Sequence, residues 1–579
     1  MTTIESKARD WAAGDPDPVT AAALMSIVES GDRALLIRAM GGFLEFGTAG
    51  IRGVVGPGSN QMNRAVVIKT TRGLADFLLD SVDAGPEAPV VVGFDARPSS
   101  RQFAEDTAGV LAAAGLQVVY FEDVTPTPLV AFAAKVLKAR GAVVVTASHN
   151  PPADNGYKVY GPNAAQIISP TDTAIAAAIA QTGPANSIPR LPDPFGVSDP
   201  LVRIAPGALL DRYWDEVSAY RTRIPSTTLK IVYTPLHGVG GPTVVDLFSR
   251  TLHDDFHVVE SQFDPDGTFP TVAFPNPEEP GALDLALEKA TEISARLVVA
   301  NDPDADRLAG AVAEGSGWRL FTGNELGVIL GSHLLENPPA TLSERPITAN
   351  SVVSSPMLAD IAAVYGAEHL VTLTGFKWII NAALAVESEG AGEFLFGYEE
   401  ALGYSVGRTV RDKDGMAAAI LLADIAALQS EKGLSLLDLL HDLWRRHGLW
   451  VSTQKSLVRP GEQGQRDIVR AVEAIANDPP EAIAGRTVAG MVDYRIGAEH
   501  RPPWLGAQPL VQLDLDGGRI LARPSGTEPK LKIYVDIRED VIAATTREEL
   551  QIQRESCLSM AEQTAREFAS MLEGRIQAD

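Results

Sequence analysis

The sequence predicts an α/β protein with three successive α/β/α sandwich domains followed by a C-terminal α+β domain. Short β-branched runs alternate with helical stretches in three rounds up to about residue 450, and strand–helix–strand order indicates mainly parallel sheets covered by helices. Beyond Trp450 the order changes to a helix, several extended segments and a last helix. No short-period repeat or low-complexity tract is present, which argues against a solenoid or a scaffold protein.

The chain begins with a predicted helical lead-in before the first α/β domain. Apolar residues recur at helical spacing between residues 17 and 40, and the charged stretch 29–33 predicts a turn between two helices. In the first domain, apolar runs predict strands at 90–92, 116–120 and 143–145, with helices at 101–114 and 129–140. The acidic, proline-rich stretch 184–206 is interpreted as a connection to the next domain.

The same alternation then restarts twice. The second domain has expected strands at 229–233, 257–260 and 297–300 and a helix after Pro242. Residues 318–322 lead into the third domain, with expected strands near 347 and at 370–373 and 394–396, and helices at 325–335 and 416–428. The last domain has a helix near 467–475, extended segments at 511–515, 520–522 and 531–537, and a helix at 547–572. We therefore expect a lead-in at 1–42 and domains at 43–210, 211–322, 323–450 and 451–579.

The composition is that of an ordinary globular protein with an acidic surface. Of 579 residues, 45% are hydrophobic and 21% charged, and the formal net charge is -25. This charge repels nucleic acid and anionic membranes, but screening over about 8 Å lets a local Arg and Lys cluster bind a small phosphate. The single Cys557 cannot form an internal disulfide and is interpreted as a packing residue. Without a signal-peptide pattern or an apolar run of about 18 residues, the protein is expected in the cytoplasm.

A serine follows the expected strand at 142–145. Residues 146–152 read Thr-Ala-Ser-His-Asn-Pro-Pro, so Ser148 should lie at the carboxyl end of a buried strand, where open α/β sheets present ligand sites. A hydroxyl at this position is a candidate nucleophile. Because Ser, Asn and Pro also form turns, the alternative is a serine that only caps the next turn, with His149 as an ordinary loop residue.

Three aspartates alternate in the segment Asp302-Pro303-Asp304-Ala305-Asp306-Arg307. In extended backbone their carboxylates would project to one side, where two charges about 4 Å apart repel by roughly 4 kcal/mol at an effective dielectric of 20. An EF-hand is excluded, because its sixth position would be Arg307 and its twelfth Ala313. The pattern predicts a Mg²⁺ site that phosphate oxygen completes, with Arg307 facing the same anion. A solvated acidic turn is the alternative.

A third motif, Arg523-Pro524-Ser525-Gly526-Thr527-Glu528-Pro529, lies between extended segments of the last domain. The guanidinium of Arg523 offers paired donors to phosphate, and the hydroxyls of Ser525 and Thr527 add further donors. Gly526 lets backbone N–H groups approach an anion closely. The motif is interpreted as a phosphate cradle, and a tight turn after proline is the alternative.

These motifs occur together with Phe-Gly-Thr-Ala-Gly-Ile-Arg-Gly at 46–53, Thr-Gly-Phe-Lys-Trp at 374–378 and Gly-Tyr-Glu-Glu-Ala-Leu-Gly at 397–403. The set closely resembles the α-D-phosphohexomutase family of phosphoglucomutases and phosphomannomutases, in the family's order and from about Phe43 to Tyr534. The glutamate pair and the Gly-Phe-Lys-Trp loop resemble the phosphoglucomutase and phosphopentomutase branch. The resemblance implies four domains around a central active-site cleft and a mutase that binds small sugar phosphates. It leaves the oligomeric state open.

The resemblance also implies a role for each matching residue. Ser148 would carry the phosphoryl group, and Mg²⁺ would be held by a phosphoserine oxygen and by Asp302, Asp304 and Asp306. The transferring group would be stabilised by Arg52, His149, Lys158 and Arg307. Lys413 matches the general acid/base, a role that requires its pKa to fall from about 10.4; a surface ion pair with Asp412 or Asp414 is its alternative. The remaining substrate ligands would be Gly375, Phe376, Lys377, Glu399, Arg523, Ser525, Gly526 and Thr527.

The implied reaction interconverts a sugar 1-phosphate and a sugar 6-phosphate, of glucose and/or mannose, through a phosphoserine and a sugar bisphosphate. Ala401 stands where many family members have a serine that contacts the sugar. The sequence therefore does not rank glucose, mannose and pentose, and a phosphopentomutase acting on ribose or deoxyribose 1-phosphate stays open. Outside the mutase class, the alternatives are a serine hydrolase and a non-catalytic sugar-phosphate-binding protein.

Overall fold

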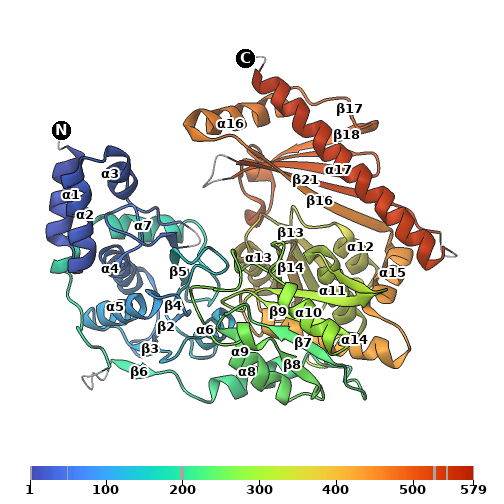
Figure 1. The fold of residues 1–579 in the computed structure, drawn as a ribbon, viewed down its shortest axis with the longest axis horizontal. Coiled ribbons are helices and arrows are strands. Elements are labelled where there is room, and N and C mark those ends of the chain that lie inside the picture. The colour runs from blue at the N-terminus through green and yellow to red at the C-terminus, as the bar shows by residue number, and fades with distance from the viewer. Residues whose placement is uncertain (1–2, 48–49, 196–200, 526–529, 543–544, 578–579) are drawn as a thin grey trace. The chain divides into compact units, whose positions relative to one another are not determined.

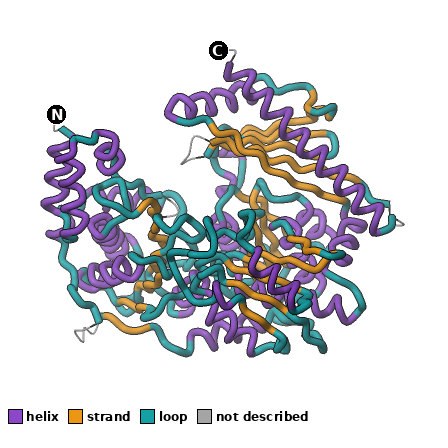
Figure 2. The backbone as a smooth tube through the Cα atoms, in the orientation of Figure 1, coloured by secondary structure: helices purple, strands orange, loops and turns teal. Residues whose placement is uncertain are grey.

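The computed structural model describes residues 3–47, 50–195, 201–525, 530–542 and 545–577. The chain divides into two compact units, the first comprising Met1–Leu320 and Gly403–Ala427, the second Phe321–Leu402 and Leu428–Asp579. The course of the chain through these elements can be followed in Figures 1 and 2.

Three short helices open the first unit: α1 (Ile4–Gly14), α2 (Pro18–Ser30) and α3 (Arg33–Met40). Side chains of Thr3, Asp17 and Asp32 accept backbone N–H groups at their N-termini, which is the usual way to satisfy these donors. The helices pack on one another through Ala8, Leu24 and other apolar residues. The predicted helix pair within 17–40 is confirmed, whereas α1 was not predicted.

The first sheet of this unit has the strand order β1-β5-β4-β2-β3-β6. β2, β3, β4 and β6 run parallel, and β5 and β1 are antiparallel additions at one edge. Its strands are β1 (Ile51–Val54), β2 (Val90–Phe94), β3 (Val118–Tyr120), β4 (Gly141–Val145), β5 (Asp154–Tyr160) and β6 (Val202–Ile204). Its helices are α4 (Arg64–Ser81), α5 (Ser100–Ala113), α6 (Thr127–Val136) and α7 (Thr171–Ala180), with a 3₁₀ turn at Ala185–Ser187.

Helices cover both faces of this sheet. Neighbouring residues of β2 point to opposite sides, so their contacts show what covers each face. Val92 belongs to a core cluster with Val66 of α4 and Leu111 of α5. A Cβ on Gly93 would meet the side chain of Val130, on α6, at 2.5 Å. The interpretation of 184–206 as a connection alone is wrong, since it contains β6, which pairs with β3.

The second sheet has the order β11-β10-β9-β7-β8. β7 (Ile231–Thr234), β8 (Phe256–Val258) and β9 (Leu297–Asn301) are parallel, and β10 (Leu308–Glu314) and β11 (Gly317–Leu320) continue antiparallel. The helical segments are α8 (Leu209–Ser218), α9 (Gly240–Ser249), α10 (Asp284–Glu292) and a 3₁₀ turn at Glu260–Gln262. We expected residues 318–322 to lead into the next domain. This is wrong for residues 318–320, because Trp318 lies on β11 and packs against the core cluster that contains Ala286 and Ala290 of α10. β15 (Gly403–Val406) and most of α14 (Gly415–Glu431) also belong to the first unit.

The second unit opens with α/β structure. β12 (Pro346–Ser351) pairs in parallel with β13 (Glu368–Thr372) and β14 (Glu393–Glu399). α11 (Gly323–Glu336) begins with a capping box in which the side chains of Thr322 and Glu325 each accept a backbone N–H of the other residue. The remaining helices are α12 (Met357–Val364), α13 (Phe376–Ser388) and α15 (Leu436–His447).

An antiparallel sheet of order β16-β21-β20-β19-β18-β17 completes the second unit. Its strands are β16 (Leu449–Val458), β17 (Ala482–Ile483), β18 (Arg486–Asp493), β19 (Val511–Leu515), β20 (Gly518–Pro524) and β21 (Lys530–Glu539). α17 (Arg547–Gln577) packs on β16 and β21 and beside α16 (Gly461–Asn477), and 3₁₀ turns lie at Ala498–His500 and Pro503–Leu505. Cys557 is fully buried on α17 and burial raises the pKa of its thiol to about 12. The thiol is therefore a packing group.

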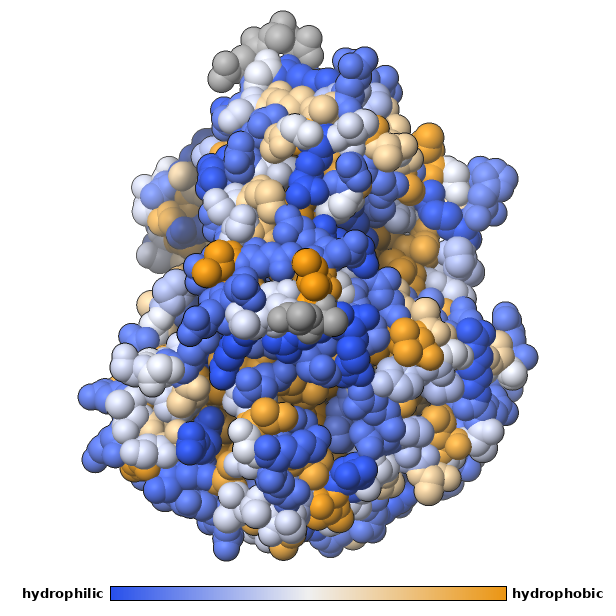
Figure 3. Space-filling model, turned by 90° about the vertical axis from the view of Figure 1, so that its right-hand side faces the viewer, coloured by the Kyte–Doolittle hydropathy of each residue, from blue (hydrophilic) through white to orange (hydrophobic). Residues whose placement is uncertain are grey.

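The face drawn in Figure 3 carries mainly hydrophilic side chains with small, separate hydrophobic spots. Among the described residues, no helix combines the length and the apolar character needed to cross a membrane.

Candidate functional site

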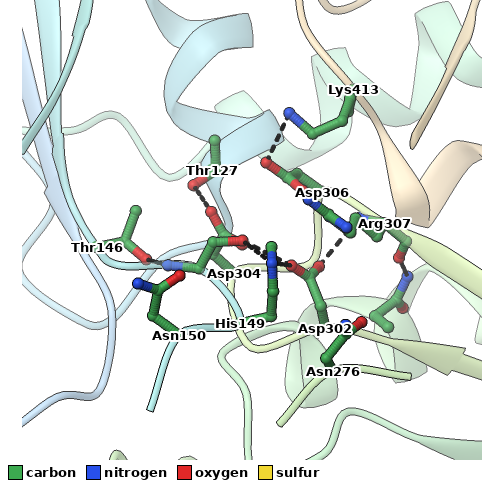
Figure 4. A network of polar contacts seen from close by, with 12 residues as sticks. Thr127, Thr146, His149, Asn150, Asn276, Asp302, Asp304, Asp306, Arg307 and Lys413 are labelled. Atoms are coloured by element: carbon green, nitrogen blue, oxygen red, sulfur yellow. Dashed lines mark hydrogen bonds and ion pairs between the residues drawn. The ribbon is translucent and has the colours of Figure 1, made fainter. Parts of the chain in front are cut away.

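The serine motif, the aspartate segment and Lys413 meet in the first unit. Ser148 follows β4, the three aspartates lie between β9 and β10, and Lys413 precedes α14. The hydroxyl of Ser148 donates a hydrogen bond of 2.9 Å to Oδ2 of Asp302. In Figure 4 the side chains of His149, Asp302, Asp304, Asp306 and Lys413 converge on one small region.

Ser148 does more than form a turn. Its φ of +52° is uncommon for a residue with a side chain, and its N–H donates to the hydroxyl of Thr146 at 2.8 Å. This conformation directs the hydroxyl of Ser148, a residue that is 3% exposed, at Asp302, 154 residues away in sequence. The interpretation as a turn cap alone is therefore excluded.

His149 lies beside the nucleophile candidate. Its Nδ1 is 3.1 Å from the Ser148 hydroxyl and 4.0 Å from Oδ2 of Asp302. Burial, followed by the positive charges of Arg307 and Arg52, holds the pKa of His149 well below its ordinary value. The imidazole is therefore neutral near pH 7 and can both donate and accept hydrogen bonds.

The aspartate segment is a turn and not the extended backbone that the spacing argument assumed. Ala305 has φ of +59° and donates its N–H to the carbonyl of Asp302 at 2.9 Å. The backbone N–H of Arg307 donates to the carboxylate of Asp302 at 3.0 Å. The three carboxylates still gather, with one oxygen from each lying within 4.8 Å of the others. Their exposed fractions are 0%, 0% and 1%, which excludes a solvated acidic turn.

Lysines oppose these buried carboxylates. Nζ of Lys158 donates to Asp304 at 2.6 Å and to Asp306 at 2.9 Å. Burial alone would raise the pKa of Asp304 and of Asp306, but the lysine charge outweighs it and both pKa values are lowered. Asp302 has no lysine at this distance among the described residues, and burial together with the other two carboxylates raises its pKa well above the ordinary value. The positive charge of Arg307 opposes this rise without cancelling it.

The donor set fits a divalent cation. Oδ1 of Asp304 and Oδ1 of Asp306 are buried and have no hydrogen-bond partner among the described residues, and a buried acceptor left unpaired costs about 1–3 kcal/mol. Carboxylate oxygens are the protein ligands that Mg²⁺ prefers. A cation bound by the three aspartates would satisfy both atoms and reverse the repulsion between the carboxylates.

Lys413 lies at the same cluster and not in a surface ion pair. Its Nζ is 3.1 Å from Asp306 and 3.3 Å from Asp412. Asp412 is itself held by the hydroxyl of Tyr160 at 2.6 Å and the amide of Gln166 at 2.8 Å. The lysine amine is therefore oriented by two carboxylates, one of them in the aspartate cluster.

Two of the arginines named from the sequence, Arg52 and Arg307, lie at the rim of this site. Arg307 is 3.8 Å from Glu278 and 4.0 Å from Asp306. Arg52 is exposed on β1 and donates to the side chain of Asn150 at 3.0 Å. The exposed guanidinium of Arg52 can approach an anion.

The predicted sugar-binding residues lie in the second unit. Gly375, with φ of +111°, precedes α13, and its N–H donates to Glu399 at 2.6 Å. Lys377 is partly buried, whereas the side chain of Phe376 is 3% exposed and belongs to the core. In this geometry Phe376 can therefore contact a ligand only through its backbone.

The predicted phosphate cradle is described in part. Arg523 lies on β20 and is partly buried. The N–H of Ser525 donates to the carbonyl of Lys530 at 2.7 Å. Gly526 and Thr527 lie outside the described residues.

Thr127 is a site residue that sequence reasoning missed. Its hydroxyl donates to Oδ2 of Asp304 at 2.7 Å, and its N–H donates to the Asp304 carbonyl at 3.0 Å. The local sequence Thr-Pro-Thr-Pro signals only a turn, so no pattern could have linked it to residue 304.

Replacing Thr127 by valine is expected to weaken divalent-cation binding about tenfold, because groups that orient a metal ligand typically contribute 10–100-fold to metal affinity. The measurement is a calorimetric titration with MgCl₂. Thr71→Val, which removes a buried hydroxyl bonded to Val67 and Tyr157, is the matched control and should leave the affinity unchanged. Equal affinities in the two variants would contradict the prediction.

Four domain families match the chain in order. They are described as phosphoglucomutase/phosphomannomutase α/β/α domain I, over 44–185, domain II, over 211–315, domain III, over 322–447, and the C-terminal domain, over 462–552.

Curated relatives span most of the chain. It is 40% identical over 484 residues to a probable phosphomannomutase of Haemophilus influenzae, covering 82% of this chain and 93% of that protein. It is 35% identical over 561 residues to the human phosphopentomutase, covering 92% and 91%. A phosphoglucomutase of Staphylococcus epidermidis is 34% identical over 507 residues, covering 86% and 91%.

Solved structures share the fold. A putative phosphomannomutase from Thermus thermophilus superposes with a TM-score of 0.68 at 21% identity, covering 92% of this chain and 100% of that one. The Paramecium phosphoglucomutase pp63/parafusin gives a TM-score of 0.66 at 18% identity, covering 91% and 95%.

Proposed function

Because the chain belongs to the phosphoglucomutase/phosphomannomutase family of intramolecular phosphotransferases, we propose that it interconverts glucose or mannose 1-phosphate and the 6-phosphate through phosphorylated Ser148. The observation that carries this proposal is the 2.9 Å contact between the Ser148 hydroxyl and Asp302 within the buried aspartate cluster. A nucleophile next to a cation-binding cluster is the arrangement that phosphoryl transfer requires.

In the proposed first half-reaction, the free hydroxyl of the sugar attacks the phosphorus of phosphoserine 148. Lys413 takes the hydroxyl proton, a new O–P bond forms, and the bond between phosphorus and the serine oxygen breaks. The serine oxygen then takes a proton from water, and the sugar is a bisphosphate. In the second half-reaction, with the sugar reversed, the Ser148 oxygen attacks the other phosphate and its proton returns to the hydroxide left by the first half-reaction. The bond between that phosphorus and the sugar oxygen breaks, and Lys413 returns its proton to the departing sugar oxygen.

The other named residues supply charge and orientation in this proposal. Asp302, Asp304 and Asp306 would hold Mg²⁺, which neutralises charge on the transferring group. Arg52, His149, Lys158 and Arg307 line the same region and stabilise the phosphoryl group as it moves. Glu399, Gly375 and Lys377 remain the proposed sugar ligands, and Arg523 with Ser525, Gly526 and Thr527 the proposed ligands of the non-reacting phosphate. We also keep the four domain boundaries as a proposal.

A pentose 1-phosphate is the second candidate substrate. Phosphopentomutase and phosphoribomutase relatives are 35% identical and cover at least 91% of both chains. Ala401 supports it as well, since a methyl group makes no hydrogen bond to a hexose hydroxyl. The candidate differs in the sugar alone and uses the same nucleophile and cluster.

The test is a side-by-side assay of the purified protein on glucose, mannose and ribose 1-phosphate, with MgCl₂ and a trace of the matching bisphosphate. We expect conversion of at least one hexose 1-phosphate to the 6-phosphate, with little free phosphate. Phosphate release in proportion to turnover would instead indicate a hydrolase. Binding without turnover would indicate a non-catalytic sugar-phosphate-binding protein, and preferred turnover of ribose 1-phosphate would support the second candidate.

A further inference from the structure

The side chain of Arg97 lies buried beneath the serine loop, which we define as residues 146–154. It is 3% exposed and follows β2. Nη2 donates to the carbonyls of Ser148 at 2.8 Å and Asn150 at 2.7 Å, and Nη1 donates to those of Pro151 at 2.6 Å and Asp154 at 2.9 Å. One guanidinium therefore binds the loop from the serine to the start of β5.

The remaining donor of Arg97 is also used. Nε lies 3.2 Å from Oδ2 of Asp95 and donates to it. A guanidinium has five N–H groups, and in Arg97 each has a protein partner. No donor of Arg97 is left for a substrate phosphate. From this geometry we propose that Arg97 is a positioning residue, which fixes the serine loop so that the Ser148 hydroxyl faces the aspartate cluster.

Arg97 is itself held from several sides. Asp95 accepts both the Arg97 N–H, at 3.0 Å, and the hydroxyl of Ser100, at 2.5 Å. The guanidinium lies over the ring of Phe269, 5.1 Å from its centroid. A Cβ on Gly267 would lie 2.3 Å from Cα of Arg97, so the segment around Gly267 and Phe269 packs directly on this turn. Both residues come from the part of the chain whose sheet carries the aspartates.

The serine loop needs the hydrogen-bond donors of Arg97. Four carbonyl oxygens converge on Arg97, and without a donor they would be unpaired, partly buried acceptors that repel one another. Ser148 is held at a positive φ, a conformation that costs about 1–3 kcal/mol and persists only when its surroundings impose it. Loss of Arg97 should let the loop relax and move the hydroxyl away from Asp302.

The inference rests on the proposed function, and the test is Arg97→Met compared with Arg140→Met. Arg140 is a matched control at the opposite end of β4, 7% exposed. It also donates to four carbonyls, those of Leu78, Val82, Ala84 and Gly85. A displacement near 1 Å can cost about 100-fold in rate, so Arg97→Met should lower kcat about 100-fold with little change in KM. Arg140→Met should reduce thermal stability similarly and keep the wild-type kcat.

A second readout separates positioning from general stability. The phosphate content of Ser148, followed by intact mass after addition of glucose 1,6-bisphosphate, should rise slowly in Arg97→Met and at the wild-type rate in Arg140→Met. Arg97→Lys, whose ammonium offers three donors from a single point, should give an intermediate kcat and serves if the methionine variant does not fold.

Wild-type kcat and wild-type phosphorylation in Arg97→Lys or Arg97→Met would overturn the inference. A crystal structure of Arg97→Lys with the Ser148 hydroxyl still 2.9 Å from Asp302 would overturn it as well, whatever the activity. Failure of the proposed function is a different result, since it is seen in the wild-type protein as an absence of turnover on all three sugars.

Discussion

Replacing Ser148 by alanine is expected to lower mutase turnover by at least about 10⁴-fold, because the phosphoryl group then has no oxygen to which it can return. No hydroxyl other than that of Ser148 donates to Asp302 among the described residues. The nearest alternative nucleophile, His149, is neutral and adjacent to the same cluster. A phosphorylated histidine would be the one route to residual turnover, and intact mass after incubation with bisphosphate would detect it.

The control for this variant is Ser59→Ala, which removes another nearly buried hydroxyl, bonded to the carbonyl of Gly42 at 2.6 Å. It should keep wild-type turnover. Ser148→Ala should also keep its affinity for Mg²⁺, since all three aspartates remain. If Ser148→Ala retains more than about a tenth of wild-type turnover, Ser148 is not the nucleophile.

The regular part of this site was predictable because its signals are local. The uninterrupted apolar run before Thr146 indicates a buried strand, and the end of that strand places Ser148 at the edge of a sheet. β4 ends at Val145, and Ser148 lies where this reasoning predicts it. The crowding of the aspartates was also predictable from their spacing, although their backbone forms a turn about Ala305 instead of the extended backbone that the spacing argument assumed.

The contacts that complete the site were not predictable, because they join segments far apart in the chain. Thr127 reaches Asp304 across 177 residues, and Tyr160 reaches Asp412 across 252. Nothing in the sequence near Thr127 or Tyr160 distinguishes these two residues from core residues. Edge strands were missed for a related reason: β6 has a partly buried first residue and two exposed ones, so it shows no apolar run, and its pairing with β3 alone makes it a strand.

Replacing Asp304 by asparagine is expected to abolish Mg²⁺ binding and to lower turnover about 10³-fold, since charge stabilisation by a metal ion contributes several kcal/mol. The fold should survive. Lys158 keeps its hydrogen bond of 2.9 Å to Asp306, and Thr127 can still donate to the amide oxygen of the new asparagine. The pKa of Asp302 is raised by burial and then by the other two carboxylates, and removal of one of these negative charges relieves the second cause in part. We therefore expect the cation-free variant to lose less than about 3 kcal/mol of unfolding free energy.

The decisive measurement is thermal unfolding with and without MgCl₂, because it reports cation binding without any sugar. A cation at 100 times its Kd stabilises the native protein by about 2.7 kcal/mol. The melting temperature of the wild-type protein should therefore rise with MgCl₂ and fall back to its starting value when EDTA is added. Asp304→Asn should show no such shift. The control is Asp424→Asn, another buried aspartate, bonded to Arg221 at 2.7 Å and His253 at 3.0 Å. It should lower the melting temperature and keep the Mg²⁺ shift, whereas an undiminished shift in Asp304→Asn would place the cation elsewhere.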